Sequence, residues 1–359
     1  MNQSDLILNV YKVLGLGGAS FFAGVALTPF LTHLLYKYKM WRKEVRTHAP
    51  DGAPVPIFQK LHGERETNVP RMGGVLIWGT TLLIALLFWV LSVLVPDPLF
   101  FKLNFLSRGQ TWVPLSIMLG GALVGFLDDW FVVHQQGAYQ GGGITFTRRI
   151  ILVIAIALLG AYWFYFKLDP LYHTLAIPEV GSLTLGVWFI PFFVLVMLAV
   201  FSSGVVDGID GLAGGVFASI FAAYAGIAFF QNQIDIAAFC AVIAGSILAF
   251  LWFNIPPARF YMSETGIMAL TTTLTVIAFL TRAVAVLPII AFPLVLESLS
   301  VIIQLSSKRF LKRKIFLVAP IHHHFEAIGW PPEKVTMRFW IISAVFAILG
   351  MIVQLMTRV

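Results

Sequence analysis

Residues 187–211 read VWFIPFFVLVMLAVFSSGVVDGIDG, and this stretch decides the fold class. Residues 187–206 contain no charged side chain. About 20 apolar residues form a helix long enough to cross the hydrocarbon core of a bilayer. Two acids, Asp207 and Asp210, follow at once among glycines. The stretch therefore predicts a membrane-spanning helix that ends in a polar, acidic segment.

The composition of the whole chain has the same character. Of its 359 residues, 59% are hydrophobic and 11% are charged, whereas soluble domains carry about 25% charged residues. The mean hydropathy is +0.88 and the formal net charge is +7. These values exclude a disordered chain, a coiled coil and an ordinary soluble globule. The single cysteine, Cys240, excludes a disulfide framework and a cysteine zinc cluster.

Ten apolar stretches recur along the chain and predict an all-α polytopic membrane protein, with residues 1–359 as a single integral membrane domain. These continuous runs differ from the alternating segments of a membrane β-barrel. The third and eighth are short and should extend into their flanking loops. Pro288 and Pro293 make the ninth the most prone to bend. The stretches lie near residues 14–36, 72–95, 113–127, 150–166, 187–206, 212–231, 236–254, 266–280, 286–304 and 339–356.

The connecting segments alternate sharply in positive charge. Four of them, residues 37–71, 128–149, 255–265 and 305–338, hold 18 of the 24 Lys and Arg residues. Cytoplasmic loops carry the excess of these residues, so this side is predicted to be cytoplasmic and both termini periplasmic. The basic run at 308–314 is interpreted as a topology and lipid anchor. A sharper interpretation adds attraction of a polyanionic substrate or a lipid phosphate.

Five acids lie where predicted spans meet the cytoplasmic side. Each alone could be a helix cap or a solvated loop acid, but together, with glycines nearby, they indicate a site. Clustered carboxylates favour a divalent cation, and their hard oxygens suit Mg²⁺ or Mn²⁺. Such a site points to phosphoryl transfer at the membrane surface. The five acids are Asp128, Asp129, Asp207, Asp210 and Glu264.

The two aspartate motifs differ in spacing. Asp128 and Asp129 are neighbours, so on a helix they point about 100° apart and are not expected to form one chelate. One would approach a metal or a phosphate, and the other would orient it or a basic partner. Asp207 and Asp210 are three residues apart, so they would share one face of a helix. A loop turn followed by small-residue helix packing at Gly214 is the alternative for the second motif.

Two further segments carry side chains suited to a nucleotide. Residues 252–266 hold an amide, Asn254, and Tyr261, which could stack on a base or belong to the aromatic belt of the membrane interface. Residues 319–326 read APIHHHFE. Three consecutive histidines cannot all face one metal, so hydrogen bonding of one or two of them to a phosphate or diphosphate is favoured over zinc binding.

Taken together, these motifs resemble a known enzyme superfamily, the polyprenyl-phosphate N-acetylhexosamine-1-phosphate transferases. The resemblance rests on Asp128-Asp129, on DGIDGLA at 207–213 and on Phe253-Asn254. Within the superfamily, PRMGG at 70–74, the histidine run, GWP at 329–331 and RFWIIS at 338–343 are similar to phospho-N-acetylmuramoyl-pentapeptide transferases. The resemblance covers nearly the whole chain, and the histidine run is its most discriminating part.

The resemblance implies a bacterial inner-membrane enzyme with ten helices, a homodimeric state and dependence on Mg²⁺. It would move phospho-N-acetylmuramoyl-pentapeptide from UDP-MurNAc-pentapeptide to undecaprenyl phosphate in the membrane lipid, giving lipid I and UMP. This is the first membrane step of peptidoglycan synthesis. No nucleic acid partner is expected. The active site would face the cytoplasm on loops 37–71, 128–149, 204–215, 254–266 and 305–338.

The same resemblance implies a role for each site residue. The predicted metal ligands and phosphate-handling residues are Asp128, Asp129 and Glu264. His322, His323 and His324 complete the catalytic set, near the substrate phosphates or sugar. The uridine pocket would be lined by Asp207, Gly208, Asn254 and Tyr261, with Asp210 in support. Arg65 and Arg149 are the basic residues expected to bind substrate.

Four departures from the family pattern affect the predicted metal geometry. Glu264 replaces the usual Asp, and Gly204 replaces the usual Asn. The segment after Asp129 lacks the usual basic residues, for which Arg148 and Arg149 could compensate. The loop before Pro70 aligns poorly, so the assignment of Arg65 to the family's lysine is an extrapolation.

Two alternatives remain open at this point. A transferase of another sugar 1-phosphate, such as GlcNAc 1-phosphate, is disfavoured by the histidine run. A lipid or ion transporter would carry ionisable groups near the bilayer midplane, but only Glu297 lies well inside a predicted span. In the enzyme, the bent ninth span would open a groove for the prenyl chain.

Overall fold

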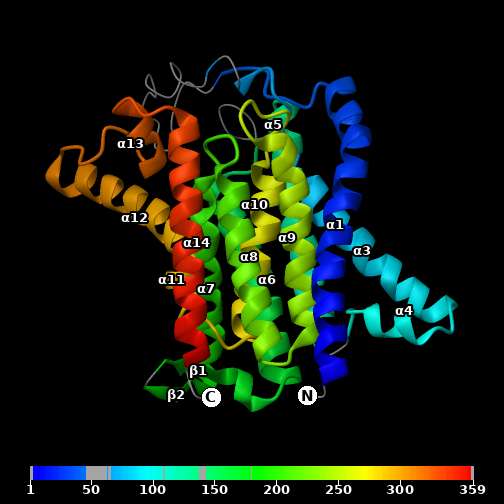
Figure 1. Ribbon diagram of the computed structural model, residues 1–359. Coiled ribbons are helices and arrows are strands. Elements are labelled where there is room, and N and C mark those ends of the chain that lie inside the picture. Colours follow the sequence, from blue (N-terminus) through cyan, green and yellow to red (C-terminus); the bar gives the residue numbers. More distant parts are fainter. Residues whose placement is uncertain are drawn as a thin grey trace.

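A computed structural model describes residues 3–45, 63, 66–107, 110–136, 143–178 and 180–356. Long helices run side by side in one bundle (Figure 1). Helix α1, Gln3–Lys37, begins and helix α14, Pro332–Met356, ends at the lower end of Figure 1. Nine helices of the described residues are long and apolar enough to cross a membrane. The prediction of an all-α polytopic membrane protein is confirmed.

The other elements follow the expected order of apolar stretches. The third and eighth helices extend beyond the short apolar cores seen in the sequence, as expected. The remaining long helices are α3 (Val75–Leu94), α5 (Trp112–Val133), α6 (Phe146–Lys167), α7 (Phe189–Ser202), α8 (Leu212–Phe230), α9 (Ile234–Asn254), α10 (Ser263–Leu280) and α12 (Phe292–Ser306).

Short elements at the ends of the bundle were not predicted. At the end that holds the termini they are helix α4, Pro98–Leu103, and an antiparallel hairpin of strand β1, Thr174–Ile177, and strand β2, Gly181–Thr184. Elements of four to six residues have no apolar periodicity that a sequence could display. The opposite end carries the short helix α13, Ile321–Ala327 (Figure 1).

The ninth apolar stretch is not one continuous helix. It is divided into α11, Leu287–Ile290, and α12, with a break at Ala291. Pro288 and Pro293 each lie at the start of one of these helices, where a missing N–H is tolerated. The expected bend is therefore present, and α12 leaves the bundle obliquely beside α14 (Figure 1).

Helix α12 has an unusual distribution of polarity. Its buried face carries polar side chains, Glu297, Ser300 and Gln304. Its exposed face carries apolar ones, including Leu299 and Ile302. The spacing of three and four residues keeps each set on one side of the helix. The helix is therefore suited to a lipid environment outside and a polar environment inside.

Helix α10 forms the centre of the bundle and is almost completely buried. Its most extensive packing is against α5. Gly121 and Gly125 on α5 lie so close to α10 that an added Cβ would overlap backbone atoms of Met268 and Glu264, respectively. Small residues four apart allow two membrane helices to approach closely. This contact brings the acids that follow Gly125 against the first turn of α10.

Candidate active site

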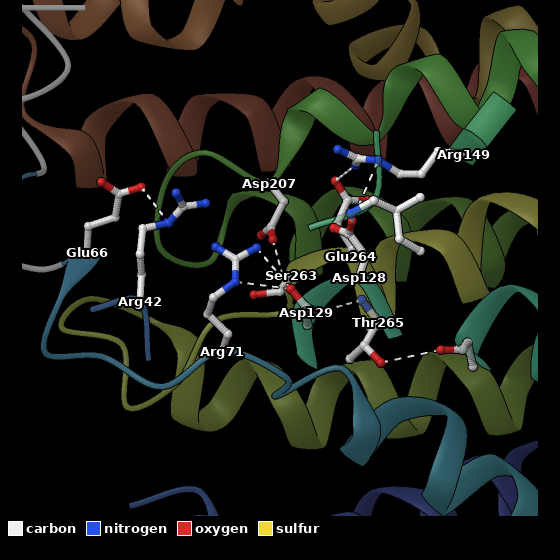
Figure 2. Close-up of polar contacts among 12 residues, drawn as sticks. Arg42, Glu66, Arg71, Asp128, Asp129, Arg149, Asp207, Ser263, Glu264 and Thr265 are labelled. Atoms are coloured by element: carbon white, nitrogen blue, oxygen red, sulfur yellow. Dashed lines mark hydrogen bonds and ion pairs between the residues drawn. The ribbon is translucent and has the colours of Figure 1, made fainter. Parts of the chain in front are cut away.

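Asp128 and Asp129 lie near the end of α5 and point to different partners, as their spacing predicts. Asp129 is fully buried and accepts a hydrogen bond on Oδ1 from Arg71 Nε, at 3.0 Å, and one on Oδ2 from Thr265 N, at 2.9 Å (Figure 2). Asp128 accepts a hydrogen bond on Oδ1 from Ile144 N, at 2.6 Å. Both oxygens of Asp129 are therefore occupied by the protein itself.

Arg149 links Asp128 to Glu264 across three helices. Its Nη1 donates to Glu264 Oε1, and its Nε lies 3.8 Å from Asp128 Oδ1 (Figure 2). Arg149 belongs to α6, Asp128 to α5 and Glu264 to α10. The side chains of Arg149 and Glu264 retain about a quarter of their exposure, at 25% and 28%. These five residues are termed the acid–arginine group: Arg71, Asp128, Asp129, Arg149 and Glu264.

The motif at 207–211 is a turn, so its two acids do not share a helical face. Gly211 has a φ of +78°, a conformation that glycine adopts readily. Asp207 Oδ2 accepts a hydrogen bond from Ser263 N at 2.8 Å, directly before Glu264. Burial raises the pKa of Asp207 to about 6, and the Ser263 N–H and the charge of Arg71 oppose this rise. The turn thus joins the acid–arginine group at the start of α10.

Asp210 and Asn254 hold this turn in place. Asp210 Oδ2 accepts from Ala258 N at 3.1 Å. Asn254 is buried, with its Oδ1 accepting from Gly211 N at 3.0 Å and its Nδ2 donating to the carbonyl of Phe260 at 2.8 Å. The carboxamide is thereby committed to two backbone segments. Asn254 therefore stabilises the backbone of the predicted nucleotide pocket.

Two of the three histidines face the same turn. An added Cβ on Gly208 would overlap His322 Nε2 and would lie 3.0 Å from His323 Nε2. His322 Nδ1 pairs with Glu297 Oε2 at 2.9 Å, and His323 Nδ1 pairs with Glu326 Oε2 at 2.6 Å. All four side chains are buried. We term them the histidine group: Glu297, His322, His323 and Glu326.

The remaining predicted residues take other positions. His324 is turned away, with its Nδ1 accepting from Leu317 N at 3.3 Å. Tyr261 is half-buried, and its backbone N–H bonds the carbonyl of Pro70 at 2.8 Å, in the segment that leads to Arg71. Arg65 lies outside the described residues. The structure thus brings together the acids, Arg149, the turn at 207–211 and two of the three histidines.

Three residues of the site were missed in the sequence. Arg71 stands in the PRMGG motif, and its position just before a span was the only signal. Glu297 was noted only as the one acid within a predicted span, yet it contacts His322. Glu326 is three residues after His323, a spacing that brings side chains together on a helix.

The structure also explains two departures from the family pattern. An added Cβ on Gly204 would lie 2.5 Å from Ile267 Cγ2, so a larger residue there meets α10 and not Glu264. Arg149 supplies positive charge to the acids, as expected, whereas Arg148 is exposed.

The free carboxylate oxygens of the site can be set against the ligands that Mg²⁺ requires. No three His, Cys, Asp or Glu side chains in the described ranges are arranged to hold a metal ion. Mg²⁺ usually takes only one or two protein carboxylates and completes its shell with water and phosphate oxygens. Within the described part of the chain, Asp128 Oδ2 and Glu264 Oε2 accept no hydrogen bond. These two oxygens fit the protein's share of such a shell.

The bundle is that of an integral membrane protein, and the proteins that it resembles are transferases. A family model described as glycosyl transferase family 4 matches residues 111–282, which include α5 to α10. A phospho-N-acetylmuramoyl-pentapeptide-transferase of Anoxybacillus flavithermus is 32% identical over 97% of this chain and 99% of its own length. Enzymes of the same name from Chloroflexus aggregans and Pelagibacter ubique are 30% and 33% identical, over 97% and 96% of this chain and 91% and 94% of theirs. The chain belongs to the phospho-N-acetylmuramoyl-pentapeptide transferase family.

Proposed function

We propose that the protein transfers phospho-N-acetylmuramoyl-pentapeptide from UDP-MurNAc-pentapeptide to undecaprenyl phosphate. An oxygen of the prenyl phosphate bonds to the β-phosphorus of the UDP-sugar. The bond from that phosphorus to the bridging oxygen breaks, so UMP leaves and lipid I forms. The observation that carries this proposal is the match to relatives of this name along almost the full chain.

The acid–arginine group suits the reacting phosphates. Arg149 is partly exposed and presents a planar guanidinium, which binds phosphate oxygens in pairs. Asp128 is the candidate for steering the prenyl phosphate or taking its proton, because Asp129 is fully occupied by Arg71 and Thr265. Arg71 has a raised pKa: burial opposes its charge, but the nearby carboxylates, Asp129 first among them, together outweigh burial. Its two contacts to Oδ1 of Asp129 hold that carboxyl group in place.

The nucleotide is expected on the neighbouring turn. Asp207 and Gly208 face the start of α10 and the two buried imidazoles. Asp207 would hydrogen-bond the uracil, and Tyr261 would stack on it. His322 and His323 would lie next to the phosphates or the sugar. This arrangement accounts for the histidine run, which argues against transfer of GlcNAc 1-phosphate.

Mg²⁺ is proposed as the cofactor, held by Glu264 and Asp128. When bound, it would offset negative charge on the transferred phosphate.

Glu264→Gln removes the charge and keeps the shape, so we expect Mg²⁺-dependent transfer to be abolished. Glu264→Asp should keep measurable activity because only its reach changes. Transfer rate against Mg²⁺ concentration decides this, with Glu333→Gln, an exposed acid of α14, as the control. Normal turnover and unshifted Mg²⁺ dependence in Glu264→Gln would contradict the assignment.

The reaction is tested with the purified full chain. It is incubated with UDP-MurNAc-pentapeptide, undecaprenyl phosphate and Mg²⁺, and UMP is measured. UMP should form only when both substrates are present. A parallel incubation replaces the donor with UDP-GlcNAc. Release of UMP from UDP-GlcNAc alone would favour the other sugar-1-phosphate transferase, and no release from either donor would refute the transferase proposal.

The site is proposed to face the cytoplasm of a bacterial inner membrane, in a homodimer. The support is the excess of Lys and Arg on the loops at its end of the bundle. Cysteines placed at Lys312 and Lys102 should be labelled from opposite sides of the membrane. The native Cys240 is fully buried and should stay unlabelled. Labelling of both introduced cysteines from outside intact cells would contradict this orientation.

A further inference from the structure

The two arginines of the acid–arginine group are held in different ways. Arg71 places Nε and Nη2 each 3.0 Å from one oxygen of Asp129. Arg149 makes one hydrogen bond to Glu264, while its Nε is buried, has no hydrogen-bond partner and lies 3.8 Å from Asp128. The guanidinium of Arg149 is thus placed by charge between two carboxylates, with part of its bonding capacity unused. Arg71 therefore has two contacts to one carboxylate, whereas Arg149 has one contact to each of two carboxylates.

The carboxylates that Arg149 contacts are also the two that fit a divalent cation. Asp128 and Glu264 each retain one oxygen without a hydrogen bond in the described part of the chain. Two cations beside the same pair of carboxylates repel one another over a few ångströms. A metal that binds there must therefore displace the guanidinium or bind weakly.

We propose that Arg149 is the resident counter-ion of Asp128 and Glu264 and competes with the divalent cation for them. This rests on the proposed use of Mg²⁺. When the metal binds, the guanidinium is released toward the diphosphate of the substrate, whose oxygens match its paired N–H groups. Arg149 therefore contacts carboxylate before substrate arrives and phosphate afterwards.

One consequence is a coupling between metal and diphosphate. A diphosphate that binds the released guanidinium removes the competitor, so it strengthens metal binding. By linkage, the metal strengthens diphosphate binding by the same factor. The longer arm of Glu264 is part of this device because it is the carboxylate that Arg149 hydrogen-bonds. The Asp that the family usually has at position 264 has a shorter side chain, so it would reach the guanidinium of Arg149 less well.

The competition is measured by Mn²⁺ binding to the purified full chain, followed by electron paramagnetic resonance without substrate. Arg149→Ala should lower the Mn²⁺ dissociation constant by about tenfold or more, because one charge-assisted contact no longer has to be broken. Arg149→Lys should fall between wild type and Arg149→Ala, because an ammonium contacts one carboxylate at a time. If Arg149→Ala does not fold, the Mn²⁺ dissociation constant of Arg149→Lys tests the competition in its place.

Arg148→Ala is the matched control. It removes the same charge one residue earlier on α6, from an exposed side chain that makes no ion pair with another described residue. Its Mn²⁺ affinity should equal that of wild type. If the Mn²⁺ dissociation constant fell equally in Arg148→Ala and Arg149→Ala, the cause would be a general charge effect, and the proposal would be overturned.

Failure of this inference can be told apart from failure of the proposed function. If Mn²⁺ binding is lost in Glu264→Gln but unchanged or weaker in Arg149→Ala, the metal site stands and the competition is wrong. If wild type and all variants fail to bind Mn²⁺, the proposed use of the metal fails and the inference with it. Added UDP should tighten Mn²⁺ binding in wild type and in Arg148→Ala, and clearly less in Arg149→Ala. Equal tightening in all three would overturn the release of Arg149.

Discussion

The acid–arginine group and the histidine group both lie beside the turn at 207–211 but are built differently. The first sits on the most tightly packed pair of helices, α5 and α10, and each carboxylate meets an arginine or a backbone N–H. The second depends on α12, which leaves the bundle, and each imidazole meets a glutamate. Each group thus supplies partners for its own acids, but only the first is built on the central helices α5 and α10.

The difference suggests a division of labour. The acid–arginine group keeps two partly exposed members, Arg149 and Glu264, and so can contact substrate directly. The histidine group is buried against Gly208 and can act through the position of the turn. Substitutions in the first group should therefore reduce turnover more than those in the second.

Asp128→Asn tests the first group and should have the largest effect. It removes the charge that steers the prenyl phosphate, so we expect turnover to fall by roughly a hundredfold or more. The UDP dissociation constant should change far less. Steady-state kinetics and calorimetry with UDP measure the two quantities. Wild-type turnover would remove Asp128 from the mechanism, whereas a trapped phosphoryl group on Asp128 in wild type would favour a two-step route.

Glu297→Gln tests the second group and should cost about 10-fold to 100-fold in kcat, as for residues that orient a functional imidazole. The carboxamide can still hydrogen-bond His322 but no longer places a negative charge beside it. Glu297→Asp should recover part of the loss, and Glu333→Gln on α14 should behave as wild type. The kcat and KM of the purified variants decide this. A loss of kcat equal to that of Asp128→Asn would contradict the division of labour.

Asp207→Ala tests the turn between the groups. Loss of a buried polar contact costs about 1–3 kcal/mol, so the UDP dissociation constant should rise roughly tenfold or more. Asp97→Ala is the matched control, because Asp97 also accepts a backbone N–H, from Leu99, at the opposite end of the bundle. Calorimetric titration with UDP measures both. Unchanged affinity in folded Asp207→Ala would place the pocket elsewhere.

The smallest expected effect is a pH dependence of stability. Burial raises the pKa of Asp207 to about 6, whereas an unfolded aspartate titrates near about 3.9. Between these values the folded protein holds a proton that the unfolded chain has lost, so stability falls as pH rises through this interval. Melting temperature should therefore drop more steeply with pH in wild type than in Asp207→Asn. Parallel melting curves for the two proteins would refute this.

The spans could be predicted because each is a long apolar run, and only the ninth holds a charged residue, Glu297. The hairpin of β1 and β2 and helix α4 could not, because they are too short to show a periodicity. Pro288 and Pro293 predicted the bend in the ninth stretch, but the direction of the bend depends on how the helices pack. The segment 207–211 is the loop turn given as the alternative, not the helix on which Asp207 and Asp210 would share a face. Glycines stand beside both acids, and Gly211 takes a positive φ.

Within the site, the acids were predictable and most of their partners were not. An acid that ends an apolar run is visible in any sequence. Asp129 and Arg71 are 58 residues apart, and Glu297 and His322 are 25 apart, so only tertiary contact joins them. The position of Glu297 within an apolar stretch signalled a function, but its partner lay in a different segment.

The reversed polarity of α12 has a practical consequence for handling the protein. A helix with Glu297 and Gln304 inside and Leu299 and Ile302 outside is stable only while an apolar solvent surrounds it. Harsh or short-chain detergents should strip this helix first and disturb His322, while α5 and α10 stay packed. Preparations could then look folded and monodisperse and yet be inactive. Nanodiscs or mild long-chain detergents should preserve both halves of the site.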